Sequence, residues 1–500
     1  MKSYLIFLIF LFGSCSMPET NKISVEQALS MSGEYSGELD KVLAHYKNDS
    51  LKLEAVRYLI ANMPFHFSRM EYFVSPEGER YVPDLRKFAD RRAVKEHCDS
   101  LLAKGYRIKK ENVHDIKNIQ ASYLIRNIDL AFEAWQNPWA KGVSFDDFCR
   151  FILPYRAQNE PISQLRETFM QQYKPILDSA RVQNSLEASI LVNNRLSQKI
   201  RYQKTGSPLE GTIDETDKSG FGTCVALCNY TTFVMRAVGI PTAVYQTTWT
   251  RMDFIHNWCT VLHNGIFYDF SPSEADTHNY ADKLATAYYL QPAKVYRHHF
   301  DADLSVLPKQ DDGYVTLLKS PLFTDVTDEE KLPTYTLQVP LEEEATGKSG
   351  LVYLCTYNNG KWRPIAIGTH EKEMGRFEHV AGRNILIVAK AVGKNELRYI
   401  SKPFLTDGKG GIRLLEPDLS QPVTVICQRE AESQVFPLAF WDTEQKTFVP
   451  LNRKSLTDST QYYDNIPTNA LLLHTYKDKN GVWIETGLAV DGRFKRNKDF

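Results

Sequence analysis

GTCVALCNYTTFVMRAVGIPT, residues 222–242, combines an amphipathic helix with a cysteine placed at its first turn. Apolar side chains recur along it at helical spacing, and Gly239, followed by Ile-Pro, ends the helix. The segment that leads into the helix contains Gly220 and Gly222, which let other groups come close to the backbone. Unpaired N–H groups and the helix dipole lower the pKa of a thiol at this end, so we interpret Cys224 as a candidate nucleophile.

The pattern after this helix changes to strands. Residues 242–249 and 257–262 are rich in β-branched and aromatic side chains. The Asn-Gly dipeptide at 264–265 favours a tight hairpin turn, and residues 266–270 follow as the return strand. The sequence therefore predicts a helix that carries the cysteine, followed by an antiparallel sheet.

A base and an orienting group can be assigned on these strands. His256 opens the second strand, and an imidazole beside Cys224 would form a thiolate–imidazolium pair. Asp269 lies on the return strand and is a candidate to orient that imidazole. A two-residue turn pairs Asp269 with Thr260, four residues from His256, so contact between Asp269 and His256 requires a bulge or an asymmetric turn.

Four short phrases stand in order along this part of the chain: G-T-C at 222–224, R-A-V-G-I-P at 236–241, H-N-W at 256–258 and Y-D-F at 268–270. Together they resemble the transglutaminase-like, or papain-like, core. In that family the nucleophilic cysteine begins a helix that ends in a similar phrase, the base histidine stands in H-x-W, and an aspartate follows on the next strand. More of the chain resembles lipoproteins of Bacteroidota that carry this core.

The resemblance implies a Cys-His-Asp triad. The nucleophile, general base and orienting carboxylate fall on Cys224, His256 and Asp269, and Trp258 is a candidate for the wall of a substrate pocket. The family often has D-P-T at the aspartate, whereas here Asp269 is followed by Phe-Ser-Pro. The aspartate phrase is therefore the weakest part of the match.

The implied reaction is acyl transfer from an amide or ester to Cys224 through a thioester. Water would then give a peptidase or amidase, and an amine would give a cross-linking transglutaminase. We expect hydrolysis of amide bonds in a peptide, a protein or a peptidoglycan stem. No cofactor is expected, and no calcium loop of the D-x-D-x-D-G type occurs in the sequence. A catalytically inactive binding or scaffold protein and a cross-linking transglutaminase remain alternatives.

A metal site is a further alternative from the residues alone. Cys224, Cys228, His256 and Cys259 form C-x-x-x-C followed by H-x-x-C, and Cys224 and Cys228 share a helix face. Cys259, however, points to the strand face opposite His256. No metal is therefore expected.

The N-terminus has the build of a bacterial lipoprotein signal. MKSYLIFLIFLFGSCS has one early lysine and then an apolar run, residues 4–12, that is too short to span a bilayer. Phe-Gly-Ser-Cys at 12–15 resembles a lipobox, which makes Cys15 the lipid anchor. We expect an exported protein that the lipid on Cys15 anchors to a bacterial membrane, namely the outer membrane. Residues 1–22 form the signal peptide and the tether.

Composition excludes one partner class and raises a question about thiols. Lys and Arg total 60 against 61 Asp and Glu, so no general attraction to nucleic acid is expected. The chain has eight cysteines, and removing Cys15 leaves an odd number. At least one thiol of the mature chain therefore has no intrachain partner.

The 500 residues exceed what one hydrophobic core usually supports. We expect an α+β protein. The expected parts are a helical N-terminal region at 23–130, the transglutaminase-like core at 131–300, a β-sandwich domain at 301–410 and a second small β domain at 411–500.

Overall fold

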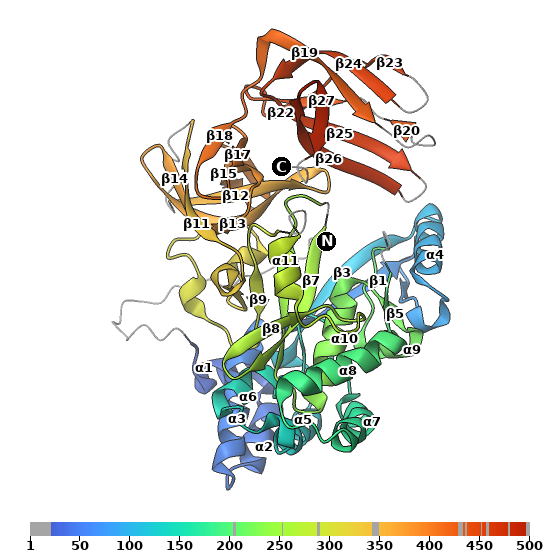
Figure 1. The fold of residues 1–500 in the computed structure, drawn as a ribbon. Helices are drawn as coiled ribbons and strands as arrows, with labels where there is room; N and C mark the ends of the chain where they lie inside the picture. The colour runs from blue at the N-terminus through green and yellow to red at the C-terminus, as the bar shows by residue number, and fades with distance from the viewer. Residues whose placement is uncertain are drawn as a thin grey trace.

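The structure is a computed structural model of the chain. It describes residues 22–203, 207–252, 254–287, 291–342, 350–428, 434–435, 438–451, 453–456, 460–478 and 481–496. These residues form an α+β fold, as expected, with the helices gathered at one end and two β-rich parts at the other (Figure 1). Cys15 and the expected signal peptide lie outside the described residues. Within them, no helix has both the length and the apolar character needed to cross a bilayer.

The N-terminal region is a helical layer with a small sheet added. Its helices pack around one apolar cluster and are α1 (Val25–Ser32), α2 (Ser36–His45), α3 (Ser50–Asn62), α5 (Ala121–Trp135) and α6 (Phe145–Phe151). Between α3 and α5 the chain forms an antiparallel sheet, not expected from the sequence, of β1 (Phe67–Val74), β2 (Arg80–Tyr81) and β3 (Arg107–His114), beside α4 (Arg91–Ala103). β3 is polar and largely exposed, so it carries no apolar alternation that a sequence pattern could reveal.

The central part is a five-stranded sheet covered by helices. The strand order is β10-β9-β6-β7-β8, with bounds β6 (Thr242–Thr248), β7 (Ile255–His263), β8 (Ile266–Phe270), β9 (Tyr296–His298) and β10 (Phe323–Asp325). The helices on one face include α7 (Arg166–Ser179), α8 (Ser185–Lys199) and α10 (Cys224–Ala237), preceded by α9 (Ile213–Ser219). Because β10 pairs with β9, this sheet continues past residue 300, where the core was expected to end.

The hairpin of β7 and β8 has the geometry that its turn sequence predicts. Asn264 and Gly265 both have positive φ, 50° and 78°, as a two-residue hairpin turn requires. The register pairs Thr260 with Asp269, without a bulge. Alternate residues divide between two clusters: Cys259 packs with the helices, and Trp258 packs in an aromatic cluster on the other face.

The end of α10 is locked onto the N-terminal helices. Gly239 has φ +85°, and a Cβ there would lie 2.2 Å from the backbone oxygen of Ala134 in α5. The carbonyl of Val238 accepts hydrogen bonds from Trp139 Nε1 at 2.7 Å and from Asn137 Nδ2 at 3.1 Å. The helix stop therefore also fixes where the helix that carries Cys224 docks.

The C-terminal half is β-rich, as expected, but each part contains one barrel-like sheet where a sandwich would have two. The first sheet holds β11 (Thr334–Pro340), β12 (Leu351–Asn358), β13 (Lys361–Glu371), β14 (Met374–Ala381), β15 (Ile385–Gly393), β16 (Glu396–Tyr399), β17 (Phe404–Thr406) and β18 (Ile412–Leu414). The second holds β19 (Asp418–Gln428), β20 (Gln434–Val435), β21 (Ala439–Asp442), β22 (Thr447–Pro450), β23 (Arg453–Leu456), β24 (Thr460–Thr468), β25 (Leu471–Asp478), β26 (Gly481–Val490) and β27 (Arg493–Arg496).

Both faces of the first β-rich sheet are buried. Val352 and Leu354 of β12 point into its own apolar cluster. The alternate residue Tyr353 joins a second cluster that includes Trp441 and Leu471 of the other sheet. The two sheets are thus held together by a shared apolar layer.

Replacement of Gly239 by alanine tests the docking of α10. The variant Gly239→Ala combines a positive φ with a backbone clash, so we expect it to lower the free energy of unfolding by about 3 kcal/mol. The matched control is Gly265→Ala, which also has positive φ but would place its Cβ in open space; its expected cost is about 1 kcal/mol. Urea unfolding measures both, and equal losses would contradict the clash.

Candidate active site

The N-terminus of α10 is built as the sequence predicts. Thr223 is the N-cap residue, its hydroxyl oxygen accepting from the backbone N–H of Ala226 at 3.4 Å and donating to Glu210 Oε1 at 2.5 Å. Cys224 is the first residue of the helix and is partly exposed. A side chain at position 222 would lie 3.0 Å from the Cβ of Ala226, which accounts for Gly222 in the approach. The Cys224 thiol therefore lies at the N-terminus of the helix, where it is partly exposed.

The thiol lies against the edge of β7. Cys224 Sγ donates to the carbonyl oxygen of Ile255 at 3.9 Å, and the backbone N–H of Asn257 points at the sulfur. These two peptide groups flank His256. The candidate nucleophile on α10 thus contacts the segment of β7 that carries the candidate base.

The pKa of the Cys224 thiol is raised above its ordinary value, contrary to the expectation for a helix N-terminus. Burial is the largest cause, because it disfavours the charged thiolate, and the nearby charge of Glu210 acts in the same direction. The backbone N–H groups of Asn257, Val225 and Cys224 itself oppose this shift without overcoming it. The resting group is a neutral thiol at physiological pH.

His256 lies among aromatic rings. It stacks on Trp249, with centroids 5.5 Å apart, and on Trp258 at 5.8 Å. Its Nε2 is hydrogen-bonded to the hydroxyl of Tyr280, the first residue of α11 (Tyr280–Thr286), at 2.9 Å. Burial lowers the pKa of His256 to about 4, so the imidazole is neutral at physiological pH. With Nε2 engaged by Tyr280, Nδ1 is the nitrogen left to accept a proton.

Asp269 does not orient His256 in the structure. The hairpin forms in the simple register, so the bulge that contact required is absent. Asp269 Oδ2 instead accepts from Trp258 Nε1 at 2.6 Å. Burial raises the pKa of Asp269, and both burial and the Asp269 charge raise the pKa of its neighbour Glu330. The two carboxyls thus form a buried pair beneath the aromatic cluster.

Trp258 is also placed differently from the expectation. Its side chain is fully buried, so it does not line a substrate pocket. It supports the site from below by contacting His256, Tyr280 and Asp269. Sequence reasoning missed Tyr280, because a tyrosine at the start of a seven-residue helix outside the matched phrases has no distinguishing pattern.

The other cysteines belong to the core. Cys259 Sγ donates to the carbonyl of Cys228, and both thiols are buried between α10 and β7. The seven described cysteines are all free thiols. In the part of the chain that the structure describes, no three His, Cys, Asp or Glu side chains are grouped so that they could hold a metal ion. The geometry therefore does not support the Cys-His metal alternative.

The loop that leads into His256 is held by the first β-rich sheet. Asn358, at the end of β12, donates through Nδ2 to the carbonyls of Trp249 and Met252, both at 2.8 Å. Trp249 is one of the rings that stacks on His256. The β-rich part therefore contributes to positioning the candidate base.

Comparisons with known proteins add little to this geometry. No protein-family model and no curated protein matches the chain. Among solved structures, the chain is similar to one from Cytophaga hutchinsonii that is described as a proposed cysteine protease. The identity is 13% and the TM-score 0.19, and the match covers 22% of this chain and 37% of that one. A TM-score this low does not establish a shared fold.

The raised thiol pKa predicts an alkaline labelling profile. Because the thiolate is the reactive form, alkylation of Cys224 by iodoacetamide should be slow at pH 6 and still rising above pH 8.5, about the ordinary cysteine value. In denaturing urea the inflection should return to about 8.5. Peptide mass spectrometry across pH gives both profiles. A rate already at its plateau near pH 6 would show a preformed thiolate–imidazolium pair and contradict this expectation.

Proposed function

We propose that this protein is a cysteine-dependent acyl-transfer enzyme that hydrolyses amide bonds in peptide or protein substrates. The observation that carries the proposal is the contact of Cys224 Sγ with the peptide groups of Ile255 and Asn257 on either side of His256. A partly exposed thiol at a helix N-terminus, in contact with the peptide groups on either side of a neutral histidine, supports nucleophilic catalysis by cysteine.

The residues support the following sequence of steps. His256 Nδ1 takes the proton of the Cys224 thiol as the sulfur attacks the substrate carbonyl carbon. The backbone N–H groups at the start of α10 stabilise the negative charge on the tetrahedral intermediate. The imidazolium then donates its proton to the leaving amine, the C–N bond breaks, and a thioester remains. Water attacks the thioester with His256 again as base, which releases the acid and restores the thiol.

Tyr280 replaces Asp269 as the positioning residue in this proposal. Its hydroxyl oxygen can accept from Nε2–H, which leaves the lone pair of Nδ1 for the thiol proton. A neutral hydroxyl orients the imidazole but stabilises an imidazolium less than a carboxylate would. The ion pair is therefore transient in this mechanism and is not the resting state.

A binding protein without turnover is the second candidate. One observation favours it: the Cys224 thiol donates to the carbonyl of Ile255 and not to the imidazole of His256. In that case the residues around Cys224 would bind a peptide without cleaving it. A cross-linking transglutaminase differs from the proposed hydrolase only in the acceptor of the thioester, and an added amine tests it.

Acylation of Cys224 tests the proposed function. Wild-type protein incubated with p-nitrophenyl acetate should gain one acetyl group at Cys224, detected by peptide mass spectrometry. His256→Ala should slow acylation by about a hundredfold, the lower range for loss of a general base. The control Cys228→Ala, one turn along the same helix and buried, should acylate like wild type. Failure of Cys224 to acylate with this ester would favour the binding protein, and transfer of the acyl group to added glycine amide faster than to water would favour cross-linking.

The identity of the positioning residue is tested by two matched variants. Tyr280→Phe removes only the hydroxyl, and we expect it to lower the acylation rate about tenfold. Asp269→Asn can still accept from Trp258 and should change the rate less than twofold. The base must be unprotonated, so the wild-type rate should fall as pH drops through about 4, the pKa of His256. A larger loss in Asp269→Asn than in Tyr280→Phe would return the orienting role to the carboxylate.

A further inference from the structure

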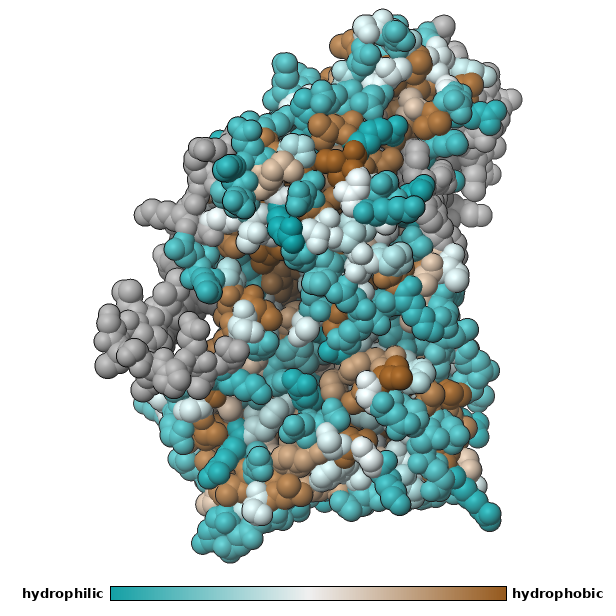
Figure 2. Space-filling view, turned by 60° about the vertical axis from the view of Figure 1, so that its left-hand side comes forward, coloured by the Kyte–Doolittle hydropathy of each residue, from teal (hydrophilic) through white to brown (hydrophobic). Residues whose placement is uncertain are grey.

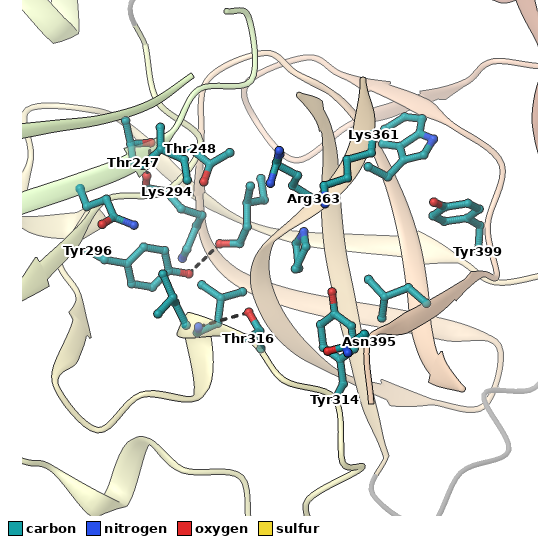
Figure 3. A pocket seen from close by; sticks show the side chains of 18 residues that line it. Thr247, Thr248, Lys294, Tyr296, Tyr314, Thr316, Lys361, Arg363, Asn395 and Tyr399 are labelled. Atoms are coloured by element: carbon teal, nitrogen blue, oxygen red, sulfur yellow. Dashed lines mark hydrogen bonds between the residues drawn. The ribbon is translucent and has the colours of Figure 1, made fainter. Parts of the chain in front are cut away.

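A pocket of about 370 Å³ opens where the ends of β6 and β7 meet the first β-rich sheet. Figure 2 shows the molecule hollowed between its β-rich upper part and its lower part, with apolar residues in the hollow. Figure 3 shows side chains from β6, β9, β13 and the segment at 314–318 converging on the pocket. The two parts of the molecule build its wall together.

The pocket is positively charged. Lys294, Lys361 and Arg363 line it, and none of its lining residues is an Asp or Glu. The ammonium group of Lys294 is already engaged, because it pairs with Asp325 and donates to two backbone carbonyls. Lys361 and Arg363 form no ion pair with any residue that the structure describes. Two cations are thus available to an anionic ligand.

The rest of the wall includes the aromatic residues Tyr296, Trp362 and Tyr399. Tyr296 donates its hydroxyl to the carbonyl of Ile365 at 2.7 Å, so its ring is held in place (Figure 3). Trp362 contacts the ring of Tyr399 with centroids 6.2 Å apart, and its indole Nε1 is a buried donor without a hydrogen-bond partner among the described residues. Cations beside flat apolar rings suit a small ligand that presents both a carboxylate and an apolar surface.

The pocket and the candidate active site share a strand end. The side chain of Ile255 lines the pocket, while its backbone carbonyl accepts from the thiol of Cys224. Thr247, also in the pocket wall, pairs with His256 across β6 and β7. A residue of the pocket wall therefore directly precedes the candidate base along β7.

We propose that this pocket is a carboxylate-binding subsite that anchors an acidic group of the substrate through Arg363 and Lys361. The assignment to substrate rests on the proposed hydrolase function. The β-rich part would then have a second role besides the contacts of Asn358 with Trp249 and Met252, namely selection of substrates that carry a free carboxylate near the scissile bond. The Arg363 guanidinium is fixed by donation from Nε to the carbonyl of Asn358 at 3.0 Å, which leaves its terminal nitrogens for the ligand.

Binding to the full chain carrying Cys224→Ala tests the subsite without turnover. Isothermal titration calorimetry compares N-acetyl-Ala-Ala with its C-terminal amide, and glucuronate with glucose, so that a peptide carboxylate and a sugar acid are separate arms. We expect one acid to bind at least about tenfold more tightly than its neutral partner, with an affinity that falls as salt rises. Equal affinity of both acids and their neutral partners would overturn the proposal.

Substitutions locate the binding. Arg363→Gln and Lys361→Gln should each weaken the preferred acid by about tenfold. The matched control Lys372→Gln removes the same charge from an exposed turn of the same sheet and should leave the affinity unchanged. Because Lys361 is exposed, Lys361→Gln should not disturb the fold. This variant therefore still tests the proposal if Arg363→Gln disturbs β13. Equal effects of all three variants would contradict a local site.

The same titrations separate the two proposals. Preference for an acid that depends on Arg363, together with acylation of Cys224 by wild type, supports the subsite. The same preference with no acylation contradicts the hydrolase and the substrate assignment, while the anion site itself stands. Acylation without any acid preference contradicts the subsite alone.

Discussion

The burial of α10 is the constraint on which the rest of the structure depends. Every side chain from Ala226 to Ala237 is buried, and the helix contacts α5, α7, α8 and α9 as well as β6 and β7. Such a helix has no freedom to turn or slide, so the position of its first residue is fixed by all its neighbours. Cys224, the first residue of the helix, is partly exposed.

Buried arginines fix the other end of the same helix. Arg236 donates to the carbonyl of Thr242 at the start of β6 and to the carbonyl of Arg156, and Arg166 in turn donates to the carbonyl of Arg236. A buried guanidinium is tolerated when its donors are satisfied, and here the acceptors are buried backbone carbonyls. The arginine of the R-A-V-G-I-P phrase thus links the helix, the sheet and the N-terminal layer, while Gly239 gives the chain room to turn.

The sequence predicted what depends on local chemistry and missed what depends on distant contacts. The helix bounds around Cys224, the turn at Asn264 and the register of Asp269 follow from neighbouring residues, and all three are present in the structure. The sheet between α3 and α5 and the strand β10 were missed. Their strands are short or polar, and they become regular only by pairing with strands elsewhere in the chain. Tyr280 was missed for the same reason: its contact with His256 spans 24 residues and arises only from folding.

The partner of His256 changes the chemistry that the fold permits. The imidazole of His256 is hydrogen-bonded to a tyrosine hydroxyl from α11, whereas the carboxylate of Asp269 accepts from Trp258. Burial with a neutral partner keeps both His256 and Cys224 uncharged at rest. In the proposed mechanism the proton moves from sulfur to nitrogen only as the substrate arrives, so the energy of substrate binding, including that of the proposed carboxylate subsite, becomes the condition for forming the nucleophile.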